Sequence, residues 1–235
     1  MTSLAAPEGE RVGALFASAG VVEAREISAA QSRDLGRLAG MLHATVDGGN
    51  ASYARPPIDE DALIDAPLAA TRGAIAGGDD LAFLETVAER VRHRLSELPR
   101  GAPDYGYCHG DLHPGNVRFD TSGQPTLFDF DFCGDGWRAY DLAVFLWNTF
   151  GERRPRRWRE SRWRAFLRGY REVRPLPEGL DEAVPLFLAA RQIWFIGLDF
   201  GGNGGWLPQW LTPQYLQEQV LPLRRWTSEY AILRG

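Results

Sequence analysis

The segment His109-Gly-Asp-Leu-His-Pro-Gly-Asn116, followed by Phe128-Asp-Phe-Asp131, decides how the rest of this sequence is interpreted. The first part lies between short β-prone runs, and its Pro and Gly predict a loop. Asp111 falls in that loop, where a carboxylate can accept a proton or orient a hydroxyl. Asn116 and Asp129 offer hard oxygen ligands at one end of a predicted hairpin, which suits a Mg²⁺ ion that also holds phosphate oxygens. The pattern therefore predicts a carboxylate and a metal that meet at a transferred phosphoryl group.

The order and spacing of these residues match the protein-kinase signature H-R-D-x-x-x-x-N followed by D-F-G. The form found here, H-G-D-L-H-P-G-N with a following D-F-D, resembles the aminoglycoside phosphotransferase family, which includes choline and homoserine kinase-like members. Trp137-Arg-Ala-Tyr-Asp-Leu-Ala143 looks like the usual continuation of that motif. The resemblance implies transfer of the ATP γ-phosphate to a hydroxyl of a small molecule such as an aminoglycoside, choline or homoserine, with Mg²⁺ and ATP as cofactors.

By this resemblance, Asp111 corresponds to the catalytic aspartate, and Asn116 and Asp129 correspond to the Mg²⁺ ligands. We expect the two ligands to converge within one metal's reach, with Asp111 facing the same cleft. Because neighbouring carboxylates raise one another's proton affinity, we also expect at least one acid there with a perturbed pKa.

Four further residues are expected to support the site. His113 is structural or close to the phosphates, Asp141 supports the catalytic loop, and Asp131 is an acid behind the ligands or a surface residue. The full supporting set is His109, His113, Asp131 and Asp141.

Two other functions compete with this interpretation. His109, Asp111 and His113 alternate along the chain, so in an extended strand they would share one face and bind the metal of a hydrolase. Pro114-Gly115 favours a loop instead, and the later Asp-Phe-Asp is then unexplained. The second alternative is a catalytically silent binding or structural protein.

Hydrophobic spacing predicts helices on both sides of the loop. Ser28 and Gln31 form a capping box, and the following helix ends at Gly48. Its expected apolar face is Leu35, Leu38, Met41 and Leu42. Asp79 or Asp80 is expected to cap a second helix, whose stripe is Leu84, Val87, Val91 and Leu95.

Short strands are predicted at 105–108, 116–119 and 126–130, with the last two forming a hairpin. Residues 11–19 are expected to form a lone strand, and helices follow at 140–150, 155–173, 180–200 and 213–233. The predicted fold class is α+β, a protein-kinase-like C-terminal lobe that is mainly helical, with a small β-hairpin carrying the catalytic loop.

The resemblance divides the chain into a remnant of the N-terminal lobe and hinge at 1–27 and a helical C-terminal phosphotransferase lobe at 28–235. In the family, an N-terminal sheet covers the nucleotide and a sheet lysine holds its phosphates. This sequence has no Gly-rich loop before residues 11–19, and all 26 of its Lys+Arg residues are arginine. We therefore expect a truncated kinase that is weakly active or inactive alone, a silent protein, or a lobe completed by another polypeptide.

Composition bounds the remaining choices. A formal net charge of −5, with 44% hydrophobic and 24% charged residues, excludes a disordered or fibrous chain and argues against a nucleic-acid coat. Two cysteines and no recognisable signal sequence favour the cytoplasm. Polar interruptions of the stretch Val184–Phe200 predict a buried helix and no membrane partner. The strand near Leu15 and Phe16 is expected to dock on the helices, to be disordered, or to pair with a second copy or partner chain.

Three other features have expected roles. Ten arginines between 153 and 174 are expected to form a solvated helix face, with an electrostatic patch as the alternative. Arg191, in an otherwise apolar helix, is expected to pair with a buried acid. Trp206 and Trp210 are expected in the core, or else in the wall of a substrate pocket.

Overall fold

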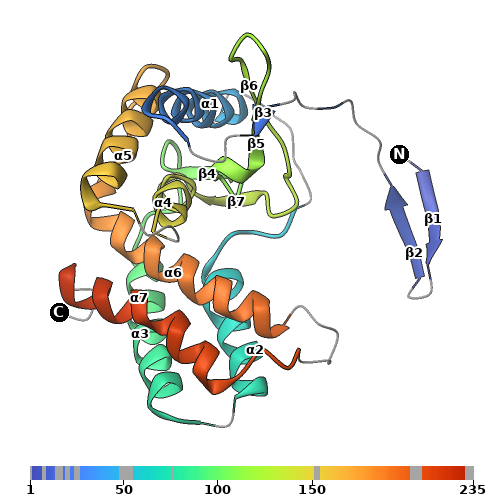
Figure 1. Cartoon of the computed structure of the whole chain (residues 1–235), viewed down its shortest axis with the longest axis vertical. Helices are drawn as coiled ribbons and strands as arrows, with labels where there is room; N and C mark the ends of the chain where they lie inside the picture. Colours follow the sequence, from blue (N-terminus) through green and yellow to red (C-terminus); the bar gives the residue numbers. More distant parts are fainter. Residues whose placement is uncertain are drawn as a thin grey trace.

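The computed structural model describes residues 2–6, 9–13, 18, 22–23, 27–47, 55–75, 77–150, 154–201 and 208–230, and the structural statements below concern these residues. The helices are α1 (Ala29–Asp47), the π-helical turn η1 (Asp61–Asp65), α2 (Ala66–Ala74), α3 (Asp79–Ser96), the short 3₁₀ turn η2 (Pro114–Asn116), α4 (Arg138–Asn148), α5 (Arg156–Arg171), α6 (Leu180–Gly201) and α7 (Pro213–Glu229) (Figure 1). The strands are β1 (Thr2–Ala6), β2 (Gly9–Gly13), β3 (Val22–Glu23), β4 (Tyr105–Cys108), β5 (Val117–Phe119), β6 (Pro125–Leu127) and β7 (Gly134–Trp137). This is the mainly helical α+β fold that the sequence predicts, with small antiparallel strand pairs.

The described strands form three small antiparallel sheets. β1 pairs with β2, β5 pairs with both β3 and β6, and β4 pairs with β7. The expected hairpin is therefore the β5–β6 pair. The 109–116 loop leaves β4 in one sheet and enters β5 in another, so both of its ends are anchored by strand pairing.

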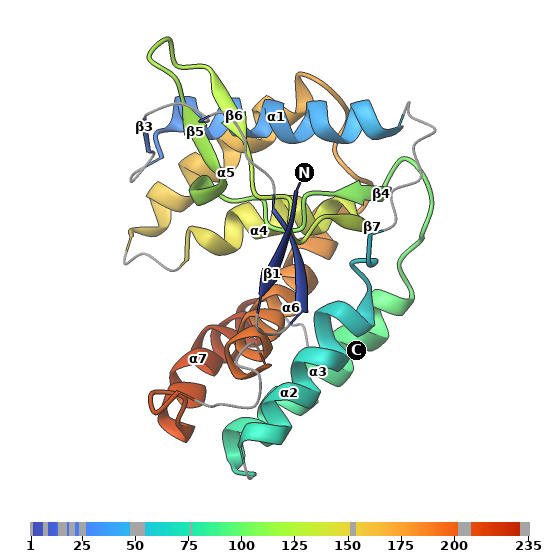
Figure 2. The ribbon, with the colours of Figure 1, turned by 90° about the vertical axis from the view of Figure 1, so that its right-hand side faces the viewer.

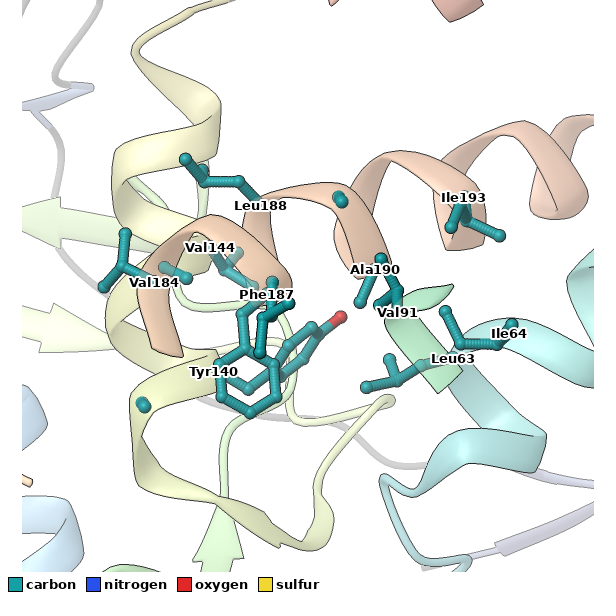
Figure 3. Close-up of a cluster of buried hydrophobic side chains, with 14 of the residues drawn as sticks. Leu63, Ile64, Val91, Tyr140, Val144, Val184, Phe187, Leu188, Ala190 and Ile193 are labelled. Carbon is teal, nitrogen blue, oxygen red and sulfur yellow. The ribbon is translucent and has the colours of Figure 1, made fainter. Parts of the chain in front are cut away.

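The helix α6 lies at the centre of the helical body and packs against α2, α3, α4 and α7 (Figure 2). Its middle is apolar on nearly all sides, which is the pattern of a core helix. Phe187 of α6 lies 5.9 Å from the Tyr140 ring of α4, and Leu63 of η1 comes from the other side of this cluster (Figure 3). Helices α4 and α6 follow β7 in the chain, and α6 packs against both α4 and η1, which precedes β4.

The helices α1 and α5 lie side by side, and α1 packs against β4 and β6 (Figures 1 and 2). The capping box that starts α1 is confirmed, with Ser28 N–H donating to Gln31 Oε1 at 2.9 Å and Gln31 N–H donating to Ser28 Oγ at 3.1 Å. The predicted apolar face of α1 is partly wrong, because Met41 is 51% exposed. The buried face consists of Ser32, Leu35, Gly36, Ala39, Gly40 and His43.

Several expected boundaries are wrong. Residues 11–13 are not a lone strand, because β2 pairs with β1; Leu15 and Phe16 lie outside the described residues. Neither Asp79 nor Asp80 caps α3, since Gly78 is the N-cap residue and both acids lie in the first turn, where they favour the helix dipole. The stripe predicted for α3 is confirmed, as Leu84, Val87, Val91 and Leu95 are fully buried.

Other differences concern the strands and the tryptophans. Asn116 belongs to η2 and not to a strand, and β6 ends at Leu127, before Asp129 turns to a positive φ of 63°. The strand β7 and the helices between 61 and 74 are additional to those predicted. Trp210 is 54% exposed, so its expected core position is wrong, while Trp206 lies outside the described residues.

By length and composition alone, one described helix, α6, is able to cross a membrane, with a mean hydropathy of 1.3 in its most apolar window. That window is 72% buried inside the protein, against α2, α3, α4 and α7, so α6 meets the apolar criterion as a core helix.

Candidate active site

Asp141, in the first turn of α4, holds the start of the 109–116 loop. Its Oδ2 accepts the His109 backbone N–H at 2.7 Å, and its Oδ1 accepts the Gly110 backbone N–H at 2.8 Å. Asp141 is fully buried, and two main-chain donors compensate its charge there. This is the geometry expected of a residue that supports the catalytic loop.

A buried chain of hydrogen bonds continues from Asp141 to α5. His43 Nε2 lies 3.0 Å from Asp141 Oδ2, and His43 Nδ1 lies 2.9 Å from the Tyr170 hydroxyl. Burial raises the pKa of Tyr170, so its hydroxyl stays protonated and donates to Nδ1, which leaves the proton on Nε2 for Asp141. Burial also lowers the pKa of His43 in spite of its bond to Asp141, so a neutral imidazole meets an ionised carboxylate.

His109 is a structural member of the loop. Its Nδ1 accepts the Asp111 backbone N–H at 3.2 Å, and its Nε2 donates to the Phe128 carbonyl at 3.0 Å, which ties the loop to the end of β6. The ring is fully buried, and both nitrogens are engaged by the main chain. The alternative metal triad of His109, Asp111 and His113 is therefore wrong for this structure, because His109 has no nitrogen left for a metal.

Asp111 is held by three side chains from two parts of the fold. Its Oδ2 accepts the Asn116 amide at 3.0 Å and lies 3.3 Å from His113 Nε2, while its Oδ1 forms an ion pair with Arg191 of α6. Burial raises the pKa of Asp111, but the hydrogen bond from His113, the charge of Arg191 and the bond from Asn116 together lower it to about 2. A perturbed acid is present as expected, but the expected direction is wrong because N–H donors surround it.

Asn116 and Asp129 are brought to one end of the β5–β6 hairpin. The pairing of Val117 with Leu127 continues in a hydrogen bond from Phe128 N–H to the Asn116 carbonyl at 3.1 Å, so Asp129 follows immediately. Asp129 has a positive φ, which is uncommon for a residue other than glycine, and it is exposed.

These residues fit a hard divalent cation. The Asn116 side-chain nitrogen donates to both the backbone and the carboxylate of Asp111, which orients the amide and leaves its oxygen as the ligand atom. An amide oxygen and a carboxylate are ligands that Mg²⁺ and Ca²⁺ prefer. Their meeting at a single ion stays a prediction.

The sequence model of the phosphotransferase enzyme family matches residues 10–176. This chain belongs to the phosphotransferase enzyme family. A relative in Deinococcus radiodurans, an uncharacterised protein, is 40% identical over 199 residues, covering 84% of this chain and 57% of the relative. A homoserine kinase of Gluconobacter oxydans is 31% identical over 183 residues, covering 74% of this chain and 54% of the kinase. The chain thus spans about half the length of the curated relatives it matches.

Solved structures of other members share the fold. An amicoumacin kinase in complex with AMP-PNP and Ca²⁺ has a TM-score of 0.69 at 22% identity, covering 92% of this chain and 62% of that one. A microcompartment-associated aminopropanol kinase has a TM-score of 0.67 at 23% identity, covering 97% and 76%. At these identities the likeness shows the kinase-like fold alone.

A pocket of about 140 Å³ opens beside the 109–116 loop of this phosphotransferase family member. Its lining includes Gly110, Asp131, Phe132, Tyr140 and Trp194, so α4, α6 and the segment after the hairpin all contribute. Phe132 and Trp194 meet edge to face at 4.9 Å. Asp131 is exposed at this pocket and does not belong to the group around Asp111.

Sequence patterns did not identify the residues that lock the loop from a distance. His43 and Tyr170 lie on α1 and α5, and nothing in their own neighbourhoods links them to Asp141. The signal for Arg191 was better, because a lone arginine in an apolar helix predicts an acidic partner; that partner is Asp111. Neither cysteine is a nucleophile candidate, since both are buried and burial raises the pKa of Cys108 well above its usual value.

Proposed function

We propose that this chain carries the catalytic loop and the metal ligands of an ATP-dependent phosphotransferase that acts on a hydroxyl of a small molecule, of the aminoglycoside, choline or homoserine type. The observation that carries the proposal is the fixed carboxylate of Asp111, held from His113, Asn116 and Arg191 beside a small pocket. The names of the relatives, which include homoserine and amicoumacin kinases, support the substrate class.

In the proposed reaction, the acceptor hydroxyl oxygen forms a bond to the γ-phosphorus of ATP while the bond to the β–γ bridging oxygen breaks, and ADP leaves. The hydroxyl proton passes to solvent water as the new bond to phosphorus forms. An Asp111 with a pKa of about 2 is a weak base at neutral pH, so its main role is to accept the hydroxyl hydrogen bond and aim the oxygen. This fits phosphoryl transfer, where positioning and electrostatics contribute most of the catalysis.

Asn116 and Asp129 would hold Mg²⁺, with ligand oxygens from the amide and the carboxylate. A bound Mg²⁺ supplies positive charge next to the phosphate oxygens. The protein's own part is to keep the Asn116 amide oriented through Asp111 and to place Asp129 at the hairpin end.

The proposal is tested by measuring ADP release and phosphorylated product with Mg-ATP and choline, homoserine or 1-amino-2-propanol. Asp111→Asn keeps the size of the side chain but removes its charge, so we expect a rate reduced by about 10²–10⁴-fold. Asp79→Asn is the matched control, because it removes an exposed carboxylate in α3, far along the fold from the loop.

We expect the Asp79→Asn rate to stay within about twofold of the unchanged protein. Equal rates for Asp111→Asn and the unchanged protein would contradict the role of Asp111. No product with any acceptor, from a chain that binds Mg-ATP, would favour the silent binding protein.

A further inference from the structure

Arg191 is a buried cation whose placement is determined by the catalytic loop. Its side chain is only 4% exposed, and its Nη2 forms the ion pair with Asp111 Oδ1. Its other terminal nitrogen lies 3.4 Å from both the Gly110 carbonyl and the Tyr140 hydroxyl. A guanidinium that cannot reach water needs its partners, because an unpaired buried charge is strongly destabilising.

The guanidinium of Arg191 is also clamped by two aromatic rings. It lies 4.1 Å from the centre of the Trp194 ring and 5.2 Å from the centre of the Trp147 ring. Stacking on ring faces favours a planar guanidinium over an ammonium, so the orientation of this side chain is fixed as well as its charge. Trp194 also lines the 140 Å³ pocket next to Gly110.

These contacts join the pocket wall and the catalytic carboxylate in one rigid unit. Asn116 and His113 take one oxygen of Asp111, and Arg191 takes the other, so rotation of the carboxylate breaks a contact to a buried cation. A buried ion pair is often no more stable than apolar side chains of the same size. Its location at this aspartate, and at the wall of this pocket, is explained by positioning better than by stability.

We propose that Arg191 is a positioning residue for phosphoryl transfer, which sets the orientation of the Asp111 carboxylate relative to the pocket lined by Trp194. The proposal rests on the proposed function for its consequence on rate, but the placement of Asp111 by Arg191 holds without it. It gives a role in the reaction to a residue of α6, Arg191, which lies 80 residues after Asp111 in the sequence.

The test compares Arg191→Met and Arg191→Lys with the matched control Arg100→Met. Arg100 also joins a carboxylate, Glu60, and lies 5.1 Å from a tryptophan ring, that of Trp137, but it does not touch the catalytic loop. Transfer to choline, homoserine or 1-amino-2-propanol is followed under single-turnover conditions with the protein in excess over Mg-ATP. The plateau rate and the half-saturating protein concentration are obtained separately.

For Arg191→Met we expect a plateau rate about 100-fold lower, with the half-saturating concentration within about twofold, because misplacement of a catalytic group by about 1 Å costs that much. Added guanidinium should restore part of the plateau rate of Arg191→Met. Arg191→Lys keeps the positive charge, so its plateau rate should lie between those of the unchanged protein and Arg191→Met. Arg100→Met should change the rate by less than about threefold. An unchanged plateau rate in both Arg191 variants would overturn the proposal.

A crystal structure of Arg191→Lys separates this proposal from the proposed function. We expect the Asp111 carboxylate to rotate away from its position between Asn116 and the former guanidinium. If the unchanged protein transfers no phosphoryl group, the proposed function fails. The crystal structures still test whether Arg191 orients Asp111, because they compare the Asp111 carboxylate in the variant and in the unchanged protein. An Asp111 carboxylate that keeps its orientation in the variant would overturn the placement.

Discussion

At the residue scale, the buried contact between His43 and Asp141 makes stability depend on pH. Burial lowers the pKa of His43, and the nearby charges of Arg138 and Arg174 act in the same direction, so the folded protein keeps this imidazole neutral. The unfolded chain protonates it near pH 6.5, so stability falls as the pH drops below that value. The pKa of Asp141 is lowered by His43 and His109 against the effect of burial, and its contribution is lost at still lower pH, below about 4.

We expect the free energy of unfolding to decrease between pH 7.5 and 5.5, by at most about 1.4 kcal/mol per pH unit below 6.5 for this one group. Denaturant unfolding at several pH values measures it. His43→Gln retains an N–H for Asp141 and should be less stable but flatter with pH. His93→Gln is the control, since His93 is 66% exposed, and should keep the slope of the unchanged protein. The same slope in both variants would rule out His43 as the source.

The residues predicted from sequence are those whose chemistry is concentrated in one short motif. The spacing of Asp111 and Asn116 carries information because one loop brings them into hydrogen-bond contact, while Asp129 follows the paired strands of the hairpin. The sequence could not identify His43 or Tyr170, because their link to Asp141 depends on how α1 and α5 pack. The direction of the Asp111 pKa was missed because the sequence does not show that His113 and Asn116 of the motif, together with the distant Arg191, all direct N–H groups at this carboxylate.

At the element scale, glycines set the distance between α1 and α5. A Cβ added at Gly36 would collide with the Phe166 carbonyl oxygen, and one at Gly169 would collide with the Arg33 carbonyl oxygen. We expect Gly36→Ala to lower the free energy of unfolding by about 1–3 kcal/mol, because the two backbones must move apart. Gly73→Ala in α2 has no atom within 4 Å of the new Cβ and should raise stability by about 0.4–1 kcal/mol.

Denaturant midpoints at constant slope distinguish these two changes. Because α5 carries Tyr170, separation of the helices should also weaken its bond to His43 and reduce the pH dependence described above. Equal midpoints for Gly36→Ala and Gly73→Ala would show that the interface adapts at no cost.

Elements with strong periodicity were predictable, and elements made by tertiary pairing were not. The stripe of α3 predicts a helix because its apolar residues recur every three or four positions. The strand β7 reads Gly-Asp-Gly-Trp, which has no strand propensity of its own, and it forms because Tyr105–Cys108 pairs with it. Pro67 lies in the first turn of α2, where proline is tolerated because the N–H that it lacks would have no partner in the helix. It therefore does not interrupt the helical segment formed by η1 and α2.

At the scale of the whole molecule, the proposed site has an acceptor-side carboxylate in Asp111, but the sequence contains no lysine to hold the phosphates. Arginine is not an equivalent phosphate clamp, because its planar fork has a different geometry from an ammonium. Arg191, which reaches the proposed site, is already paired with Asp111. We therefore expect the chain by itself to transfer phosphoryl groups far more slowly than the roughly 1–100 s⁻¹ that is usual for kinases.

Binding of Mg-ATP should persist at a weak level, because the proposed metal ligands Asn116 and Asp129 flank one end of the hairpin, which the fold anchors through the pairing of Val117 with Leu127. Calorimetric titration with Mg-ATP measures it, with Asn116→Ala expected to abolish the heat and Asp79→Asn to leave it unchanged. EDTA should have the same effect as Asn116→Ala, since both remove the link between the hairpin and the phosphates. Turnover at ordinary kinase rates that Asp111→Asn abolishes would contradict the expectation of slow phosphoryl transfer. It would mean that another segment of this chain binds the phosphates in place of the usual lysine.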